Sequence, residues 1–260
     1  MIFLNPKKIQ PQKPLFIYLP GMDGTGKLFY TQADELTRSF DLRCLSIPAN
    51  DLNNWRTLTK KTIDSIEQEI AHSSSRPVYL CGESFGGCLA LNVAVAAPNI
   101  VQRLILVNPA SCFNQRPFLG WGVNLIPWIP DYIHRTSALG LLPFLAELSR
   151  IKLPERRALI EAMRLLPQKV VSWRLSLLRD FNLTKQELKN IKQPTLIIAG
   201  GADKLLPSVE EAQRLVKTLP QGKVITLPKS GHACLIEAET NLHDILAQNN
   251  FLELDRLVPN

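Results

Sequence analysis

The chain has 260 residues, of which 45% are hydrophobic and 20% charged, and its formal net charge is +7. These values are ordinary for a soluble globular protein, and a chain of this length can bury a core without disulfide support. The five cysteines are an odd number without C-x-x-C spacing, which favours buried thiols over a disulfide framework or a zinc site.

Strand-like and helix-like segments alternate between residues 14 and 109. In chain order, the pattern predicts a strand at 14–20, a helix at 27–40, a strand at 42–48, a helix at 57–73, a strand at 77–82, a helix at 86–98 and a strand at 101–109. This alternation is typical of an α/β protein with a mostly parallel sheet and helices on both faces.

The alternation breaks between residues 110 and 190, where helical patterns occur without a convincing strand. It then resumes with strands at 194–201 and 223–228 and helices at 208–220 and 238–250. Neither flank would make a complete sheet alone. We therefore expect residues 1–109 and 191–260 to form one core, with residues 110–190 inserted as a helical cap.

The sequence Gly82-Glu83-Ser84-Phe85-Gly86 fits G-x-S-x-G between a predicted strand and a predicted helix. A Ser on such a turn sits in strained backbone, so the residues two positions away must be small. A helix N-terminus favours the negative charge of an acyl-transfer oxyanion. Ser84 is therefore the predicted nucleophile. The alternative is a Ser that only caps the helix before a Gly-rich packing contact.

A Ser nucleophile of this kind is followed along the chain by an acid and then by a His. Asp203 follows the predicted strand 194–201, and His232 lies on a loop after the strand 223–228. Taken singly, Asp203 could be a turn residue and His232 a surface loop residue. Their order after successive strands predicts a triad in which His232 is the base and Asp203 orients it.

A tetrahedral intermediate also needs hydrogen-bond donors for its oxyanion. The backbone N–H of Phe85, directly after Ser84, is the first predicted donor. The second is the N–H of Met22, in the Gly-rich loop 19–26 after the first predicted strand. A phosphate-binding interpretation of this loop lacks both G-x-x-x-x-G-K-[ST] and the full G-x-G-x-x-G.

Four segments, LPGMDGTG, GESFGGCLAL, GGADKLLPS and SGHACLIE, together resemble the α/β-hydrolase superfamily. More narrowly, they are similar to the hydrolase part of the plastid and cyanobacterial phytyl ester synthase / diacylglycerol acyltransferase-like proteins. The resemblance implies an α/β-hydrolase fold and transfer of fatty acyl groups from thioesters or lipids to phytol or a related alcohol. Many members carry a second, acyltransferase-like domain. We expect this chain, which ends at Asn260, to lack it, so that hydrolysis and transfer both remain open.

The predicted cap is rich in large apolar side chains, which suggests a lid that lines an acyl-chain pocket. Trp121, Trp128 and Phe144 are the candidate substrate-binding residues. The alternative is that the insertion only packs on itself and on the sheet. The Trp side chains, with Arg116 and Arg135 nearby, could also contact a membrane interface.

The sequence thus predicts a serine hydrolase or acyltransferase that acts on a small-molecule acyl ester or thioester, without a metal or organic cofactor. The alternatives are a type II-like acyl-carrier thioesterase and a catalytically silent, ligand-binding hydrolase fold. The spread basic residues form no nucleic-acid motif, but they leave open an acyl carrier protein or a membrane surface as partner. Without a signal peptide or an apolar run of ~18 residues, we expect a cytoplasmic protein, either free or peripheral to a membrane.

Overall fold

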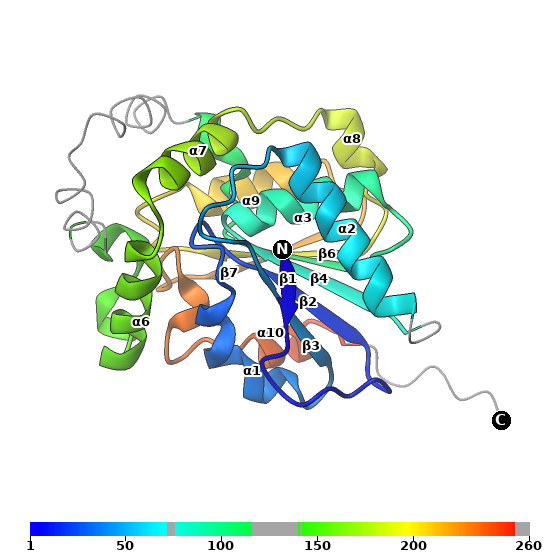
Figure 1. Ribbon diagram of the computed structural model, residues 1–260, viewed down its shortest axis with the longest axis horizontal. Coiled ribbons are helices and arrows are strands. Elements are labelled where there is room, and N and C mark those ends of the chain that lie inside the picture. The colour runs from blue at the N-terminus through cyan, green and yellow to red at the C-terminus, as the bar shows by residue number, and fades with distance from the viewer. Residues whose placement is uncertain (72–75, 116–139, 141, 253–260) are drawn as a thin grey trace.

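One sheet runs through the molecule, with strands from both ends of the sequence (Figure 1). The computed structural model describes residues 1–71, 76–115, 140 and 142–252, and within these ranges the sheet has seven strands in the order β1-β3-β2-β4-β5-β6-β7. Their bounds are β1 (Ile2–Leu4), β2 (Leu15–Leu19), β3 (Asp41–Ser46), β4 (Val78–Glu83), β5 (Arg103–Val107), β6 (Thr195–Gly200) and β7 (Gly222–Leu227). Except for β1, which pairs antiparallel with β3, the strands pair in parallel, which confirms the predicted mostly parallel α/β sheet.

The short edge strand β1 was not predicted. Only Ile2, Phe3 and Leu4 pair with β3, and Asn5 and Pro6 follow at once. Three residues are too few to show an alternating pattern, and the strand depends on the edge that β3 offers it. The six predicted strands all form.

The two faces of the sheet bury alternate side chains of the same strands. In β2, Leu15, Ile17 and Leu19 belong to one core cluster, whereas Phe16 and Tyr18 belong to the other. A strand that is buried on both faces reads as a continuous apolar run, as LFIYL does. Helices must therefore cover both faces.

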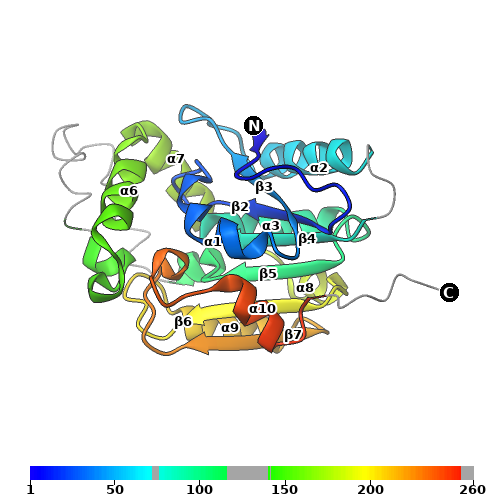
Figure 2. The same cartoon turned by 90° about the horizontal axis from the view of Figure 1, so that it is seen from below.

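Helices do cover both faces (Figures 1 and 2). The first face carries α2 (Trp55–Ala71), α3 (Phe85–Ala96), α8 (Lys185–Asn190) and α9 (Ser208–Val216). The opposite face carries α1 (Tyr30–Leu36), which follows the 3-10 turn η1 (Lys27–Phe29), and α10 (Leu242–Gln248). The helix α10 begins four residues later than predicted, where the Asn241 side chain accepts a hydrogen bond from the N–H of Asp244.

Residues 110–190 contain only helical elements within the part that is described. These are the 3-10 helices η2 (Ala110–Gln115) and η4 (Leu148–Arg150), a helical turn at 142–145, α6 (Leu153–Arg164), α7 (Gln168–Arg179) and α8. Leu177, Leu178 and Phe181 join the main core cluster beside α3. Leu142, Leu159 and neighbouring residues form a smaller cluster with Ile236. The segment therefore packs on the core as well as on itself.

The carboxyl ends of the parallel strands face the side on which α6 lies, as the arrowheads in Figure 2 show. The loops after β2, β4 and β6 leave the sheet at this side. In parallel sheets, ligands bind outside the carboxyl ends of the strands. This edge is therefore the place to look for a functional site.

Within the described ranges, every helix is too short or too polar to span a bilayer.

All five cysteines are free and buried. Burial raises the pKa of the Cys44 thiol to about 12 and acts in the same direction on the other four.

Candidate active site

Ser84 occupies the sharp turn between β4 and α3, in a backbone conformation that side chains rarely adopt. Its φ is 53° and its ψ is −113°. A Cβ atom at Gly82 would lie 2.2 Å from the carbonyl oxygen of Gly86, and one at Gly86 would lie 2.1 Å from the carbonyl oxygen of Leu19. Both positions therefore require glycine, which is the steric demand that the sequence predicted for this turn.

The Ser84 side chain does not cap α3. Its Oγ lies 2.8 Å from Nε2 of His232 instead. The alternative interpretation of Ser84 as a helix cap is therefore wrong. The hydroxyl points away from the helix that it precedes and toward the loop after β7.

His232 bridges Ser84 and Asp203. Its Nδ1 lies 2.7 Å from Oδ2 of Asp203, on the opposite side of the ring from Ser84. With the proton on Nδ1, the imidazole donates to Asp203, and Nε2 accepts from the Ser84 hydroxyl. The side chain is buried, at 4% exposed, so His232 is not a surface loop residue. The structure thus brings together three residues that lie 119 and 29 positions apart in the sequence, Ser84, Asp203 and His232.

Asp203 is held in a turn of its own. Oδ1 accepts hydrogen bonds from the backbone N–H groups of Leu205 at 2.8 Å and Leu206 at 3.0 Å. Oδ2 accepts from the Ser208 hydroxyl at 2.5 Å and faces His232. The two interpretations of Asp203, as a turn residue and as the partner of His232, therefore both hold, because different oxygens serve them.

The electrostatics of the pair favour an ion pair when His232 gains a proton. Burial on its own would raise the pKa of Asp203, but the imidazole of His232 and the Ser208 hydroxyl outweigh it and lower that pKa. Burial on its own would lower the pKa of His232, but the carboxylates of Asp203 and Glu83 outweigh it and raise that pKa. Asp203 therefore stays ionised and stabilises the imidazolium form of His232.

Asn108 organises the surroundings of His232, a role that sequence reasoning missed. It is fully buried at the end of β5, with φ at 41°. Its Nδ2 donates to the carbonyl oxygens of His232 at 2.6 Å and Gly231 at 3.2 Å, and its Oδ1 accepts from the N–H of Gly200 at 2.7 Å. One amide thus ties β5, the end of β6 and the loop of His232 together. In the sequence, Asn108 is only a polar residue that follows a predicted strand.

Glu83, directly before Ser84, is a second feature that the sequence did not predict. Its carboxylate accepts a hydrogen bond from the Tyr18 hydroxyl on the neighbouring strand β2. Burial raises the pKa of Glu83 to about 7, against the opposing effects of the Tyr18 hydrogen bond and His232. The site thus holds a carboxyl group that titrates near neutral pH, and its charge raises the pKa of His232.

This titration predicts a pH-dependent loss of stability. Because the pKa of Glu83 is about 7 when folded and 4.5 when unfolded, the unfolded chain ionises first as pH rises. The free energy of unfolding should fall from about pH 4.5 to pH 7 and then level off, with a total loss of about 3 kcal/mol from this group. Urea unfolding at pH 5 and pH 8 should show this loss in the wild type and not in Glu83→Gln. The exposed Glu67→Gln variant is the control, and an unchanged pH dependence in Glu83→Gln would contradict the assignment.

The loop after β2 (residues 20–26, the β2 loop) folds back against the nucleophile. A Cβ atom at Gly21 would lie 3.8 Å from Cβ of Ser84. Gly24 and Gly26 have φ of 70° and 67°, which only glycine adopts without strain. Met22 lies on this loop. Phe85 opens α3 on the other side of Ser84, and as the first helical residue it has an N–H group without an intrahelical acceptor.

The predicted substrate-binding residues of the cap are only partly placed. Phe144 lies on the helical turn at 142–145 and is 51% exposed. Trp121 and Trp128 lie outside the described residues, as do Arg116 and Arg135. In the ranges that are described, no cluster of three His, Cys, Asp or Glu residues could hold a metal ion.

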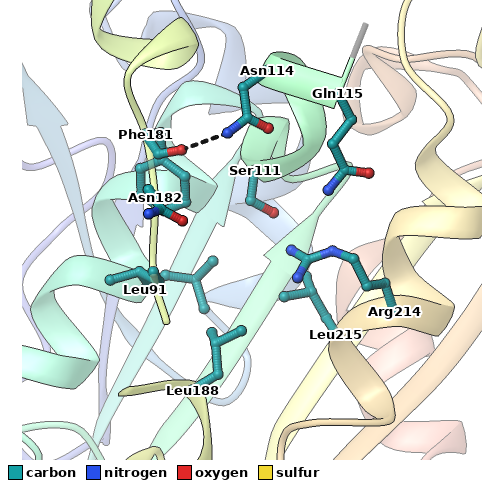
Figure 3. A pocket seen from close by; sticks show the side chains of 10 residues that line it. Leu91, Ser111, Asn114, Gln115, Phe181, Asn182, Leu188, Arg214 and Leu215 are labelled. Atoms are coloured by element: carbon teal, nitrogen blue, oxygen red, sulfur yellow. Dashed lines mark hydrogen bonds between the residues drawn. The ribbon is translucent and has the colours of Figure 1, made fainter. Parts of the chain in front are cut away.

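A small pocket lies elsewhere, between η2, α8 and α9 (Figure 3). Its volume is about 50 Å³, and Ser111, Asn114 and Arg214 are among the residues that line it. The guanidinium of Arg214 is already paired with Glu211. A space of this size suits ordered water rather than an acyl chain, and its lining contains none of Ser84, Asp203 and His232. We therefore do not regard it as the substrate site.

Comparison with known proteins gives one family match and many relatives. A family described as "Serine aminopeptidase, S33" matches residues 49–239. Phytyl ester synthase 1, chloroplastic, from Arabidopsis thaliana is 30% identical over 256 residues, which is 90% of this chain and 36% of that protein. The chain thus spans about a third of that relative's length.

The chain is also similar to a bacterial esterase in sequence and to a second bacterial esterase in structure. The pimeloyl-[acyl-carrier protein] methyl ester esterase of Nitrosomonas europaea is 25% identical over 209 residues, covering 77% of this chain and 81% of the esterase. Among solved structures, an esterase from Exiguobacterium antarcticum superposes with a TM-score of 0.76 at 17% identity, covering 95% of this chain and 98% of that one. The structural similarity shows a shared fold.

Proposed function

The chain belongs to the serine aminopeptidase S33 family of α/β-hydrolases and is an enzyme of that class, and we propose that it cleaves lipid-like acyl esters or thioesters through an acyl-enzyme on Ser84. One observation carries this proposal. His232 lies within hydrogen-bond reach of both Ser84, at 2.8 Å, and Asp203, at 2.7 Å. A nucleophile, a base and an orienting carboxylate in this arrangement define serine acyl-transfer chemistry.

In the acylation step, Oγ of Ser84 attacks the acyl carbonyl carbon while Nε2 of His232 takes the hydroxyl proton. The electron pair of the carbonyl moves onto its oxygen, and the N–H groups of Phe85 and Met22 are the proposed donors to this oxyanion. As the tetrahedral intermediate collapses, the bond to the leaving group breaks. His232 gives its proton to the departing alcohol or thiol, and Asp203 stabilises the imidazolium throughout.

The deacylation step reverses these roles. A water molecule or an alcohol attacks the Ser84 ester, and Nε2 of His232 takes its proton. Collapse of the second intermediate returns the proton to Ser84 and releases an acid or a new ester. The same groups therefore support hydrolysis and transfer, and the acceptor that reaches the acyl-enzyme decides between them.

The similarity to a phytyl ester synthase supports a lipid-like acyl substrate, with phytol or a related alcohol as the acceptor in a transfer reaction. Because the chain covers 36% of that relative, we propose for it only the acyl-transfer chemistry and not the whole activity of the synthase. Five free, buried cysteines support a reducing, cytoplasmic location. The substrate would come either from solution or from a membrane surface.

A second candidate is an enzyme that releases acyl groups from a carrier protein. The similarity to a carrier-protein methyl ester esterase favours it. So does the exposed surface of α6 and the start of α7, where four cations accompany one anion: Lys152, Arg157, Arg164 and Lys169, with Glu161. Such a surface complements an acidic carrier.

A fluorophosphonate probe tests the proposed chemistry. The probe should label the wild type covalently, and labelling should disappear in Ser84→Ala and persist in Ser65→Ala. The Ser65 hydroxyl donates to the Lys61 carbonyl on the solvent side of α2. Labelling reports the activated nucleophile without knowledge of the substrate. A folded wild type that remains unlabelled would favour a ligand-binding protein without catalysis and would refute the proposal.

Product analysis then separates the candidate reactions. Acyl-CoA, acyl-carrier protein and p-nitrophenyl esters should each be offered with water alone and with phytol. Phytyl ester as the main product identifies transfer, whereas free acid identifies hydrolysis. A strong preference for the carrier-bound acyl group, lost in Arg157→Glu/Arg164→Glu, would favour the second candidate.

A further inference from the structure

A buried arginine from the helical segment reaches the β2 loop. Arg174 lies in α7 and is only 2% exposed. Its Nη1 donates to the carbonyl oxygen of Met22 at 2.6 Å, and its Nη2 donates to that of Pro48 at 3.3 Å. An arginine that is taken out of water to bind backbone carbonyls carries a desolvation cost, so its placement calls for a reason.

The same guanidinium contacts the other side of the nucleophile. Its central carbon lies 6.0 Å from the centroid of the Phe85 ring, within the range of a cation–π interaction. Arg174 thus touches both Met22 and Phe85, the two residues whose N–H groups are the proposed oxyanion donors. It touches them through other atoms, a carbonyl and a ring, so the N–H groups remain available.

The β2 loop is shaped to receive this side chain. A Cβ atom at Gly24, where φ is 70°, would lie 2.5 Å from Nη1 of Arg174. Asp23 adds an opposite charge that attracts Arg174, while its own Oδ2 accepts from the N–H of Thr25 at 2.9 Å and from the Thr25 hydroxyl at 2.5 Å. The bend of the loop and the absence of a side chain at Gly24 leave room for the guanidinium, and the carboxylate of Asp23 complements its charge.

Two tryptophans dock the helix that carries Arg174. Nε1 of Trp55, in α2, donates to the carbonyl oxygen of Leu177 at 2.8 Å. Nε1 of Trp173 donates to the carbonyl oxygen of Asn53 at 3.1 Å. The ring of Trp55 also stacks on Phe85, with centroids 4.7 Å apart. These contacts fix α7 on both sides of Arg174.

We propose that Arg174 is a positioning residue that holds the β2 loop so that the N–H groups of Met22 and Phe85 point to one oxyanion. This inference rests on the proposed function of Ser84. It adds that the oxyanion site is completed from α7, outside the strands and loops that carry the triad. Arg174 does not touch the reacting atoms, and its effect on the rate is exerted through the loop.

Arg174→Lys and Arg174→Met test this role, with Arg179→Met as the matched control at the exposed end of the same helix. A lysine retains the charge but cannot donate along two directions in one plane. Since loss of one oxyanion donor costs about 10²–10³ in rate, a displaced loop should lower kcat by roughly 10–100-fold, with Arg174→Lys less affected than Arg174→Met. The KM should change little, and Arg179→Met should match the wild type.

The inhibition constant of a trifluoromethyl ketone distinguishes a positioning role of Arg174 from a merely structural one. The ketone forms a tetrahedral adduct with Ser84, so its inhibition constant reports the oxyanion site. The constant should rise by the same factor as kcat/KM falls, with rates normalised to titrated active sites so that unfolded molecules do not count.

The outcomes distinguish a failure of the proposed role of Arg174 from a failure of the proposed function. Folded Arg174 variants with wild-type kcat and inhibition constant would overturn the role of Arg174 and leave the proposed function intact. So would variants in which only KM rises. If Arg174→Met does not fold, Arg174→Lys decides by the same criteria. A wild type without any turnover or labelling would instead refute the proposed function, and the role of Arg174 with it.

Discussion

Replacing Ser84 by Ala should lower kcat by about 10⁶-fold while the protein remains folded, because no other group can carry the acyl chain. His232→Ala should cause a loss of similar size, since the Ser84 hydroxyl then has no base within 2.8 Å. The double variant should lose no more than either single variant, because the two residues act as one unit. Steady-state hydrolysis of a p-nitrophenyl ester measures all three rates.

The controls separate catalysis from folding. Each variant should keep the circular dichroism spectrum and the cooperative thermal transition of the wild type, and Ser65→Ala should keep its rate. Near-wild-type turnover in His232→Ala would refute the assignment of the base. A double variant that is far slower than both single variants would show that the two residues act independently.

Replacing Asp203 by Asn should lower kcat by about 10⁴-fold, because the amide favours the wrong tautomer of His232. It should also move the acidic limb of the pH–rate profile. The base must be neutral, so activity is lost as pH falls through the pKa of His232, and the Asp203 carboxylate raises that pKa. Removing the charge should therefore shift the acidic limb to lower pH.

The pH–rate profiles of kcat/KM for the wild type and Asp203→Asn measure this shift. Ser208→Ala is a graded comparison, because it removes one hydrogen bond to Asp203 at 2.5 Å and keeps the carboxylate. It should lose much less activity than Asp203→Asn. A limb that moves to higher pH in Asp203→Asn, or that does not move, would contradict the assigned role of this carboxylate.

The sequence was sufficient wherever a local pattern reports a local requirement. The apolar run LFIYL is buried on both faces as β2, and Gly82 and Gly86 sit where any side chain would collide with backbone. The order of Ser84, Asp203 and His232 after successive strands placed all three at one edge, because parallel strands bring their carboxyl ends together.

The contacts that the sequence did not reveal join residues far apart in the chain. Arg174 reaches Met22 across 152 positions, Asn108 reaches His232 across 124, and Tyr18 reaches Glu83 across 65. In a helical pattern, Arg174 looks like any polar residue, and Asn108 looks like a turn residue after a strand. Their roles depend on which elements pack together, and periodicity does not encode this.

The five buried cysteines make the chemistry of their sulfur atoms depend on the integrity of the whole molecule. Cys44, Cys81, Cys88, Cys112 and Cys234 are shielded in the interior and resist ionisation while the fold is intact. Alkylating reagents and peroxides attack the ionised form, so they must wait for molecules that have opened. The rate of thiol modification therefore records how often the native protein unfolds, without any added label.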